Sequence, residues 1–282
     1  MVDVAVPDLA PSGGRLMGRA DLHIHSLASD GISSVAEILD AATEAGLDVI
    51  AITDHERVDA ALAAQRMAHR ANAPIEVIVG EEISTRSGHL IGLFLTERIK
   101  PWQSLRTSVA RIHDQGGLAV VAHPLVPYPL CASAGAIRRL LDDSDPTFHP
   151  DGIEAFNPTT AGMRWTRRVP AFVAETGRAA IGSSDAHRAR DVGQAVTTFS
   201  GTTSAELREA IVGRRTDWEG TFYPWRSQLS MFRLQLDKNV RAVRDEVRGK
   251  LSRDGTGRDL GYPGGRMRPP RFDERADGSE SI

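Results

Sequence analysis

Continuous apolar segments alternate along most of the chain with segments in which apolar residues recur at helical spacing. The apolar segments predict β-strands at 15–25, 47–55, 75–83, 89–95, 118–124, 151–157 and 179–187. The helical patterns fall between and after them, at 35–45, 59–71, 104–117, 134–143, 167–177 and 204–215. Strands that are apolar on both faces and separated by helices are typical of parallel βα units.

This alternation predicts an α/β fold, and the number of units favours a closed barrel over an open sheet. A Rossmann-type sheet is the alternative, but no Gly-x-Gly-x-x-Gly motif follows the first predicted strand. The first predicted helix has its own boundary signals, because Ser33 or Ser34 can cap its amino end and Gly46 ends it.

We divide the chain into an N-terminal linker at 1–14, the barrel at 15–226, an amphipathic helix at 227–251 and a disordered tail at 252–282. Apolar residues at helical spacing predict the C-terminal helix. The Gly, Pro, Arg and Asp content of the tail predicts disorder. A basic amphipathic helix can bind nucleic acid or a membrane surface, but we favour packing on its own domain or on a partner subunit.

The composition narrows the class of protein. Of the 282 residues, 41% are hydrophobic and 25% are charged, as in globular proteins with a sizeable core. The net charge of -3 does not indicate a dedicated nucleic-acid binder. Cys131 is the single cysteine, which excludes an internal disulfide. Without a recognisable signal peptide or membrane-spanning stretch, the expected location is cytoplasmic, with no membrane partner.

Ionisable side chains gather where the predicted strands end. The pattern pairs His23 with His25, Asp54 with His55, Glu81 with Glu82, and Asp185 with His187, and it adds the single residues His89 and His123. In a parallel barrel all strand carboxyl ends open onto one face. His89 reaches that face only if the segment 84–89 returns like a hairpin. Clusters of histidine and carboxylate at one face are typical of sites for divalent transition metals.

The spacing within these pairs supports one shared site. His23 and His25 are two residues apart, so their side chains point the same way on a strand, and Asp185 and His187 repeat this relation. One such pair alone is weak evidence for a metal site, whereas the same pattern at successive strand ends is strong evidence.

The other three histidines are not expected in this site. His69 and His113 lie inside helical patterns and are expected at the surface, and His149 is expected at the opposite end of the barrel.

The segments DLHIHSLASDG, ITDHE, VGEEIS, GHLIGLF, VAHP and GSSDAH, in this order, resemble the polymerase and histidinol phosphatase (PHP) domain family. The resemblance covers roughly residues 19–199. It implies a distorted (β/α)7 TIM-like barrel that holds two or three divalent ions of manganese, iron or zinc. The implied activity of this barrel is phosphoester hydrolysis.

The resemblance also implies a role for each matching position. The first metal site would use His23, His25, Glu82 and Asp185; the second would share Glu82 and add His89 and His123; the third would use Asp30, His55 and His187. Glu81 is expected to be a neighbouring polar residue only. Asp21 and Asp54 match no ligand position, and we expect them to contact ligating imidazoles and fix their tautomers.

A water shared by two ions and ionised to hydroxide is expected to attack phosphorus. From this set we expect His123, His187 and Asp185 to take part in catalysis. Fixed cations and a polar amide near the strand ends are candidate substrate contacts: Arg86, Asn157, Arg164 and Arg188. Cys131 has no setting that indicates a reactive thiolate.

The preferred interpretation is a metal-dependent phosphoesterase acting on a small phosphorylated metabolite or nucleotide. A 3'-5' or 5'-3' exonuclease or nucleoside phosphodiesterase is the first alternative. The short connection between His89 and His123 and the modest charge argue against a nucleic-acid partner. A histidinol phosphatase is the second alternative, and a non-catalytic PHP module is the third. The sequence leaves the substrate, the metal and the oligomeric state open.

Overall fold

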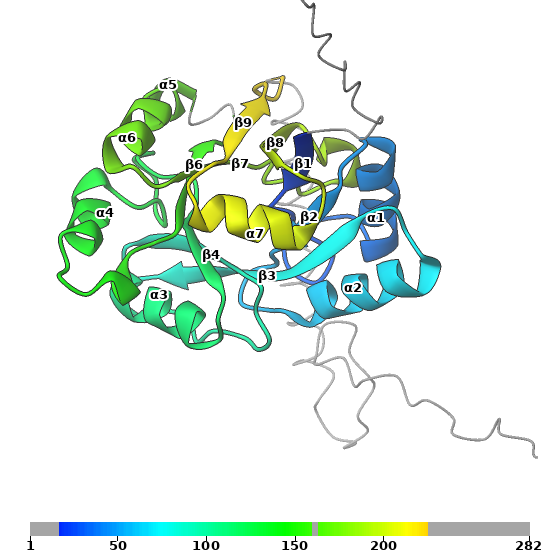
Figure 1. The fold of residues 1–282 in the computed structure, drawn as a ribbon, viewed down its shortest axis with the longest axis horizontal. Helices are drawn as coiled ribbons and strands as arrows, with labels where there is room; N and C mark the ends of the chain where they lie inside the picture. Colours follow the sequence, from blue (N-terminus) through cyan, green and yellow to red (C-terminus); the bar gives the residue numbers. More distant parts are fainter. Residues whose placement is uncertain (1–16, 160–162, 225–282) are drawn as a thin grey trace, which may run out of the picture. The chain divides into compact units, whose positions relative to one another are not determined.

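The computed structural model describes residues 17–159 and 163–224 (Figure 1). The predicted linker at 1–14, the helix at 227–251 and the tail at 252–282 lie outside these residues. One mixed sheet forms the centre of the fold. Its strands are β1 (Met17–Asp21), β2 (Val49–Ile52), β3 (Glu76–Thr85), β4 (Gly88–Leu93), β5 (Leu118–Val121), β6 (Gly152–Phe156), β7 (Ala179–Gly182), β8 (Ala195–Ser200) and β9 (Asp217–Gly220).

The strand order is β7-β6-β5-β4-β3-β2-β1-β8-β9. Strands β1, β2 and β3 pair in parallel, as do β5, β6 and β7. Strand β4 is antiparallel to both neighbours and returns through a hairpin from β3, as the sequence predicted for the segment before His89. All the parallel strands therefore deliver their carboxyl ends to one end of the sheet.

The sheet nearly closes because β7 lies against β8. The Thr197 hydroxyl accepts a hydrogen bond from the Gly182 amide (3.1 Å) and donates one to the Gly182 carbonyl (2.9 Å). A Cβ at Gly182 would lie only 2.6 Å from the Val196 carbonyl oxygen. Glycine is therefore required at this position for the two strands to approach so closely.

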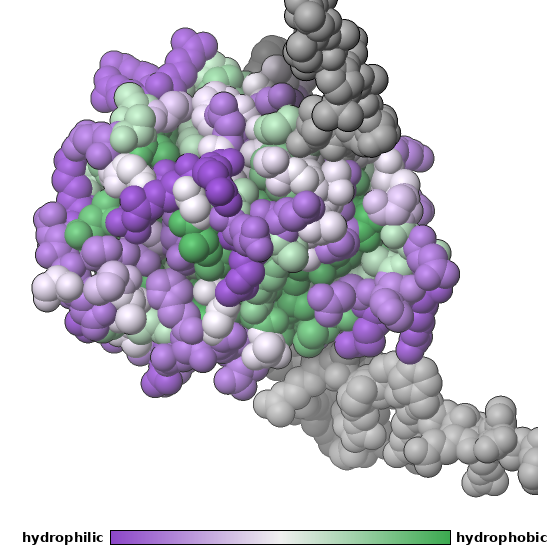
Figure 2. Space-filling view, in the orientation of Figure 1, coloured by the Kyte–Doolittle hydropathy of each residue, from purple (hydrophilic) through white to green (hydrophobic). Residues whose placement is uncertain are grey.

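Helices cover both faces of the sheet. They are α1 (Val35–Glu44), α2 (Asp59–Ala71), α3 (Leu105–Asp114), α4 (Ala134–Leu141), α5 (Met163–Thr166), α6 (Val169–Thr176) and α7 (Ser204–Val212). Ser34 is the cap of α1, forming a reciprocal capping box with Glu37. In Figure 2, hydrophilic side chains predominate on the helices at the edge of the molecule. None of the helices in the described ranges is long and apolar enough to cross a membrane.

Alternate residues of β2, β3 and β5 enter two separate hydrophobic clusters. Val49 and Ala51 of β2 pack in one cluster with Leu207 and other residues of α7. Ile50 belongs to the other cluster, which contains the buried faces of α1, α2, α3, α4 and α6. Burial on both sides explains why the strands read as continuous apolar runs.

The predicted distorted (β/α)7 barrel is confirmed, with two differences. Strands β8 and β9 have no counterpart among the predicted strands, and the segment that contains β9 reads as turn-rich. Strand β8 pairs antiparallel with β1, and β9 pairs antiparallel with β8. The first strand ends at Asp21, and the chain continues in extended form, with only Ile24 making an isolated bridge to Ala186. The antiparallel additions depend on long-range pairing, which local patterns do not encode.

Candidate metal centre

The segments that follow β1 and β7 lie side by side. The His25 amide donates to the Ala186 carbonyl (2.8 Å), and the Ala186 amide donates to the His23 carbonyl (3.2 Å). Asp185 Oδ1 consequently lies 3.6 Å from His23 Nε2 and 3.3 Å from His25 Nε2. Segments far apart in the sequence thus bring two imidazoles and a carboxylate together.

Glu82 lies at the centre of the cluster and is 1% exposed. Its Oε2 is 3.2 Å from Nε2 of His23 and 3.2 Å from Nε2 of His25, and it is 3.3 Å from Nδ1 of His55. Glu82 is placed there by backbone pairing beyond the end of β2, where its amide donates to the Thr53 carbonyl (3.1 Å). This oxygen therefore faces imidazoles delivered by β1 and β2.

The other oxygen of Glu82 faces a second pair of imidazoles. Oε1 lies 2.6 Å from His89 Nδ1 and 3.0 Å from His123 Nε2, and these two nitrogens are 3.4 Å apart. The β3–β4 hairpin brings His89 opposite Ser84. Each oxygen of this carboxylate therefore faces a different group of imidazoles.

Asp30 forms a third group at the more open side of the cluster. Its Oδ2 is 3.0 Å from His187 Nε2, and its Oδ1 is 3.4 Å from His25 Nδ1 and 3.8 Å from His55 Nε2. The ligand atoms of His25, Asp30 and His187 all lie within 4.8 Å of one another. The resemblance placed His55 with Asp30 and His187, whereas in this geometry His55 also contacts Glu82.

Close carboxylates and burial shift the pKa values of the imidazoles in the cluster. Burial opposes ionisation of His25, but Asp185 and Glu82 outweigh it and raise the pKa of His25 to about 10. Despite its burial, the same carboxylates raise the pKa of His23, while the pKa of Glu82 is well below its usual range because imidazoles surround its buried carboxylate. In contrast, burial lowers the pKa of His55. When no other cation is bound, protonated imidazoles therefore balance the negative charge of the carboxylates.

Two buried atoms test whether metal ions fit. Nε2 of His23 and Nε2 of His25 are buried and have no hydrogen-bond partner among the residues of 17–159 and 163–224, and such orphaned polar atoms are costly. Both atoms point at Glu82 and Asp185. A divalent ion among them would satisfy the nitrogens and compensate the carboxylates, and mixed imidazole and carboxylate ligands suit manganese, iron and zinc.

Glu154 of β6 belongs to the site, although sequence reasoning did not assign it there. Its Oε1 is 2.8 Å from His23 Nδ1, and its Oε2 accepts from the His123 amide (2.6 Å) and from Asn157 Nδ2 (3.4 Å). Glu154 is 1% exposed. A glutamate inside an otherwise apolar strand, Gly152–Phe156, is the signal that could have identified it, because a buried carboxylate requires partners.

The expected roles of Asp21 and Asp54 differ in the structure. Asp21 accepts from the Ser184 and Gly193 amides and touches no imidazole among the described residues. Asp54 accepts from Ser26 and Ser29, and only the Ser29 hydroxyl reaches His25 Nδ1, at 3.5 Å. Both aspartates therefore fix the loops at strand ends rather than the rings themselves.

Cys131 is a contact that the sequence did not reveal. It lies half-buried in the loop after β5, with its Sγ 3.3 Å from His123 Nδ1.

Two residues of the cluster have a left-handed backbone conformation, since His123 has a φ of 26° and Asp185 a φ of 52°. Such left-handed conformations are costly for residues other than glycine and persist where the surroundings impose them.

The four expected substrate contacts occupy different settings. Asn157 is buried and donates to Asp185 Oδ2 (3.2 Å), so it supports the carboxylate. The Arg188 guanidinium is buried and donates to Asp191 (2.5 Å). Arg86 is exposed and donates to the Trp102 carbonyl (3.0 Å), and Arg164 is exposed on α5.

Comparison with known proteins places the chain among proteins with a PHP domain. The PHP domain family matches residues 21–132, and the PHP-associated family matches residues 164–216. An uncharacterized protein of Methanocaldococcus jannaschii, MJ1587, is 34% identical over 150 residues, which cover 49% of this chain and 81% of that protein.

Two further similarities are more limited. A 5'-3' exoribonuclease of Haemophilus influenzae is 40% identical over 81 residues, covering 26% of this chain and 27% of the enzyme. A crystal structure from Bacteroides vulgatus, of a two-domain protein containing a predicted PHP-like metal-dependent phosphoesterase, superposes with a TM-score of 0.56 and 20% identity. The superposition covers 78% of this chain and 68% of that chain. At that identity, the second similarity concerns the fold alone.

Proposed function

Because this chain belongs to the PHP family of metal-dependent phosphoesterases, we propose that it hydrolyses a phosphate ester of a small metabolite or nucleotide. The observation that carries this proposal is Glu82, with one oxygen toward His23 and His25 and the other toward His89 and His123. Bound divalent ions would supply positive charge for the phosphate oxygens and lower the pKa of an attacking water.

The ions would be held by the nine residues assigned from the resemblance: His23, His25, Asp30, His55, Glu82, His89, His123, Asp185 and His187. Glu154 would keep the proton of His23 on Nδ1 and turn Nε2 toward the centre. Asn157 would hold one oxygen of Asp185 and leave the other directed at His23 and His25.

The orientation and exposure of the side chains support the proposed contributions of His123, His187 and Asp185 to catalysis. His187 Nδ1 is 2.9 Å from the Asp185 carbonyl oxygen, so its Nε2 is directed at Asp30. Asp30, His55, His123 and His187 are the more accessible members of the cluster, with side chains 37%, 30%, 19% and 17% exposed. A proton passed to the departing alcohol would most readily come from this accessible side. Arg164 and Arg86 are the exposed cations available to orient a phosphate.

The adjacent glutamates Glu81 and Glu82 allow a matched test. Glu81 points away from the cluster, and its Oε2 accepts from the Ile99 amide (2.7 Å). Glu82→Gln should lower kcat/KM of the manganese-loaded protein for p-nitrophenyl phosphate by on the order of 100-fold or more, because it removes the bridging charge. Glu81→Gln should keep the activity. Equal activity of both variants, or no activity of the loaded wild type, would refute the proposal.

Phosphodiester hydrolysis is the second candidate. It is supported by the similarity to an exoribonuclease over 81 residues, although only 27% of that enzyme is covered. The connection between His89 and His123, consisting of the rest of β4, α3 and β5, contains no inserted domain. Faster turnover of bis(p-nitrophenyl) phosphate than of p-nitrophenyl phosphate would favour this candidate, above all if it survives deletion of residues 227–282.

A further inference from the structure

The alcohol part of the substrate can be inferred from the surface beside His123. We propose that Tyr128 and Trp165 form an aromatic clamp for a nucleobase, with Arg164 next to it for a phosphate. The substrate is then a nucleotide, either free or at the end of a single strand. This inference rests on the proposed function, and it adds a recognition site that the metal cluster does not contain.

The loop between β5 and α4 fixes Tyr128 close to the cluster. The Leu125 amide donates to the Ala132 carbonyl (2.8 Å), which closes the loop at its base, and the His89 amide donates to the Leu130 carbonyl (2.8 Å). Within the loop, the Cys131 amide donates to the Tyr128 carbonyl (3.3 Å), while the Cys131 thiol touches His123. Tyr128 is therefore one turn away from a residue in contact with the metal centre.

The same loop presents the tyrosine ring in a restricted conformation. Tyr128 lies between Pro127 and Pro129, whose rings restrict the backbone, and it is 48% exposed. Leu125 and Leu130 have φ values of 67° and 66°. Strained conformations of this kind concentrate in functional segments. A large aromatic ring held at the surface on a restricted loop can bind a ligand at a low entropic cost.

Trp165 comes from a different part of the chain and meets Tyr128. It lies on α5, which follows the loop after β6, and that loop begins at Asn157, in contact with Asp185. The centroids of the two rings are 6.4 Å apart with their planes tilted by 60°. Two aromatic side chains at the carboxyl ends of neighbouring strands have the placement of a base-stacking site, since every nucleobase offers a π-face.

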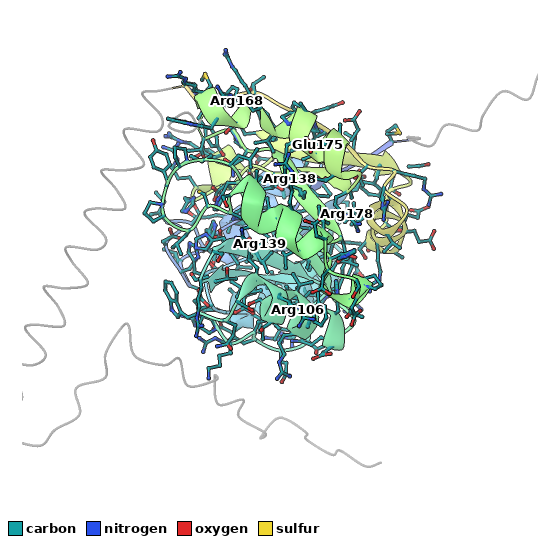
Figure 3. All side chains as sticks on the ribbon, turned by 90° about the vertical axis from the view of Figure 1, so that its left-hand side faces the viewer. Arg106, Arg138, Arg139, Arg168, Glu175 and Arg178 are labelled. Atoms are coloured by element: carbon teal, nitrogen blue, oxygen red, sulfur yellow. The ribbon has the colours of Figure 1, made fainter. Side chains whose placement is uncertain are left out.

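The charges around this pair match a phosphate-bearing ligand. On the face seen in Figure 3, Arg106 pairs with Asp143 and Arg138 with Glu175. In contrast, neither Arg164, which directly precedes Trp165, nor Arg168, three residues after it, forms an ion pair with any residue of the described ranges. A sugar phosphate would use the arginines alone, whereas a nucleotide would use both the arginines and the rings.

The test compares three substrates of the manganese-loaded, full-length protein: 5'-AMP, a 5'-phosphorylated tetranucleotide and glycerol 2-phosphate. Tyr128→Leu and Trp165→Leu should each raise KM for 5'-AMP roughly 5- to 100-fold, the range for loss of one stacking contact. The expected kcat is unchanged, and KM for glycerol 2-phosphate stays within about twofold. Tyr128→Phe should behave as the wild type. Met67→Ala, at an exposed apolar residue of α2, is the matched control.

An equal rise in KM for 5'-AMP and glycerol 2-phosphate, or no rise for 5'-AMP, would overturn the clamp. A lower KM for the tetranucleotide than for 5'-AMP identifies a strand end as the ligand, and the reverse identifies a free nucleotide. If the manganese-loaded wild type hydrolyses none of the substrates, the proposed function fails. Binding of 5'-AMP then tests the clamp separately. Quenching of tryptophan fluorescence by 5'-AMP should then be absent in Trp165→Phe and weakened in Tyr128→Leu, and quenching that persists in both variants refutes the clamp.

Discussion

Glu154 and His23 are joined by a buried contact of 2.8 Å between Oε1 and Nδ1. Both side chains are inaccessible to solvent, and the second oxygen of Glu154 accepts from the His123 amide (2.6 Å). One carboxylate on β6 thereby orients a ring that follows β1 and the backbone of a residue that follows β5. The candidate metal site consequently depends on a residue that is not itself among the candidate ligands.

The first prediction concerns Glu154→Gln. A glutamine offers a single acceptor oxygen, so it cannot serve His23 and the His123 amide together. We expect manganese affinity to fall roughly 10- to 100-fold, as is typical when a partner of a ligating histidine is removed. Calorimetric titration of the metal-free protein measures this. Glu175→Gln, at an exposed glutamate paired with Arg138, should bind metal as the wild type does. Unchanged affinity of Glu154→Gln would show that the contact has no orienting role.

The second prediction concerns protons. The carboxylates around His25 raise its pKa to about 10, and carboxylates also raise the pKa of His23, while contact with Cys131 and with Glu82 raises the pKa of His123 despite burial. His25 is then protonated at pH 7.5, and metal binding to its ring must displace that proton. Titration of zinc or manganese into the metal-free protein should release protons, which a weakly buffered indicator dye detects. Release should diminish as the pH approaches 10. Metal binding without proton release at pH 7.5 would contradict this charge distribution.

The third prediction concerns Glu81, which is fully buried on the side of β3 away from the cluster. Burial raises its pKa from 4.5 to about 8. The folded protein holds this proton more tightly than the unfolded chain, so stability falls as the pH rises between these values. Glu81→Gln should therefore be more stable than the wild type at pH 9, by on the order of a few kcal/mol, with little or no advantage at pH 4.5. Chemical unfolding at both pH values measures the difference, and an advantage that does not depend on pH would contradict it.

The fourth prediction concerns His113, expected at the surface but found partly buried and bonded to Asp151 (2.9 Å) and to the Thr147 carbonyl (2.7 Å). The hydrogen bond to Asp151 raises the pKa of His113. A raised pKa stabilises the fold below pH 6.5, and this contribution is lost as the pH passes the folded-state value. His113→Gln should thus be less stable at pH 5.5, by under about 1 kcal/mol for so accessible a pair. The penalty should be smaller at pH 9. His69→Gln, at an exposed position of α2, should show no such pH dependence.

Local patterns were sufficient for the parallel strands, for the helices other than α5 and for a cap of α1 at Ser33 or Ser34, because side-chain periodicity and terminal hydrogen bonds depend on neighbours in sequence. They also indicated which residues lie at strand ends. Spacing of two places His23 and His25 on one side of an extended chain, and the shared direction of parallel strands sends such residues to one end of the barrel. The structure brings these residues together with Asp185 and Glu82.

The tertiary structure alone decided which distant partners each side chain meets. Strands β8 and β9 complete the sheet through pairing across long sequence separations. Glu154 reaches His23 across 131 positions, and Tyr128 meets Trp165 from a separate loop. Periodicity fixes the side of a strand on which a residue lies, but contacts across the barrel depend on strand order, closure and loop conformation. Those depend on the packing of the whole chain, which is why the sequence indicated the candidate metal site and left the contacts that support it and the residues around it undetermined.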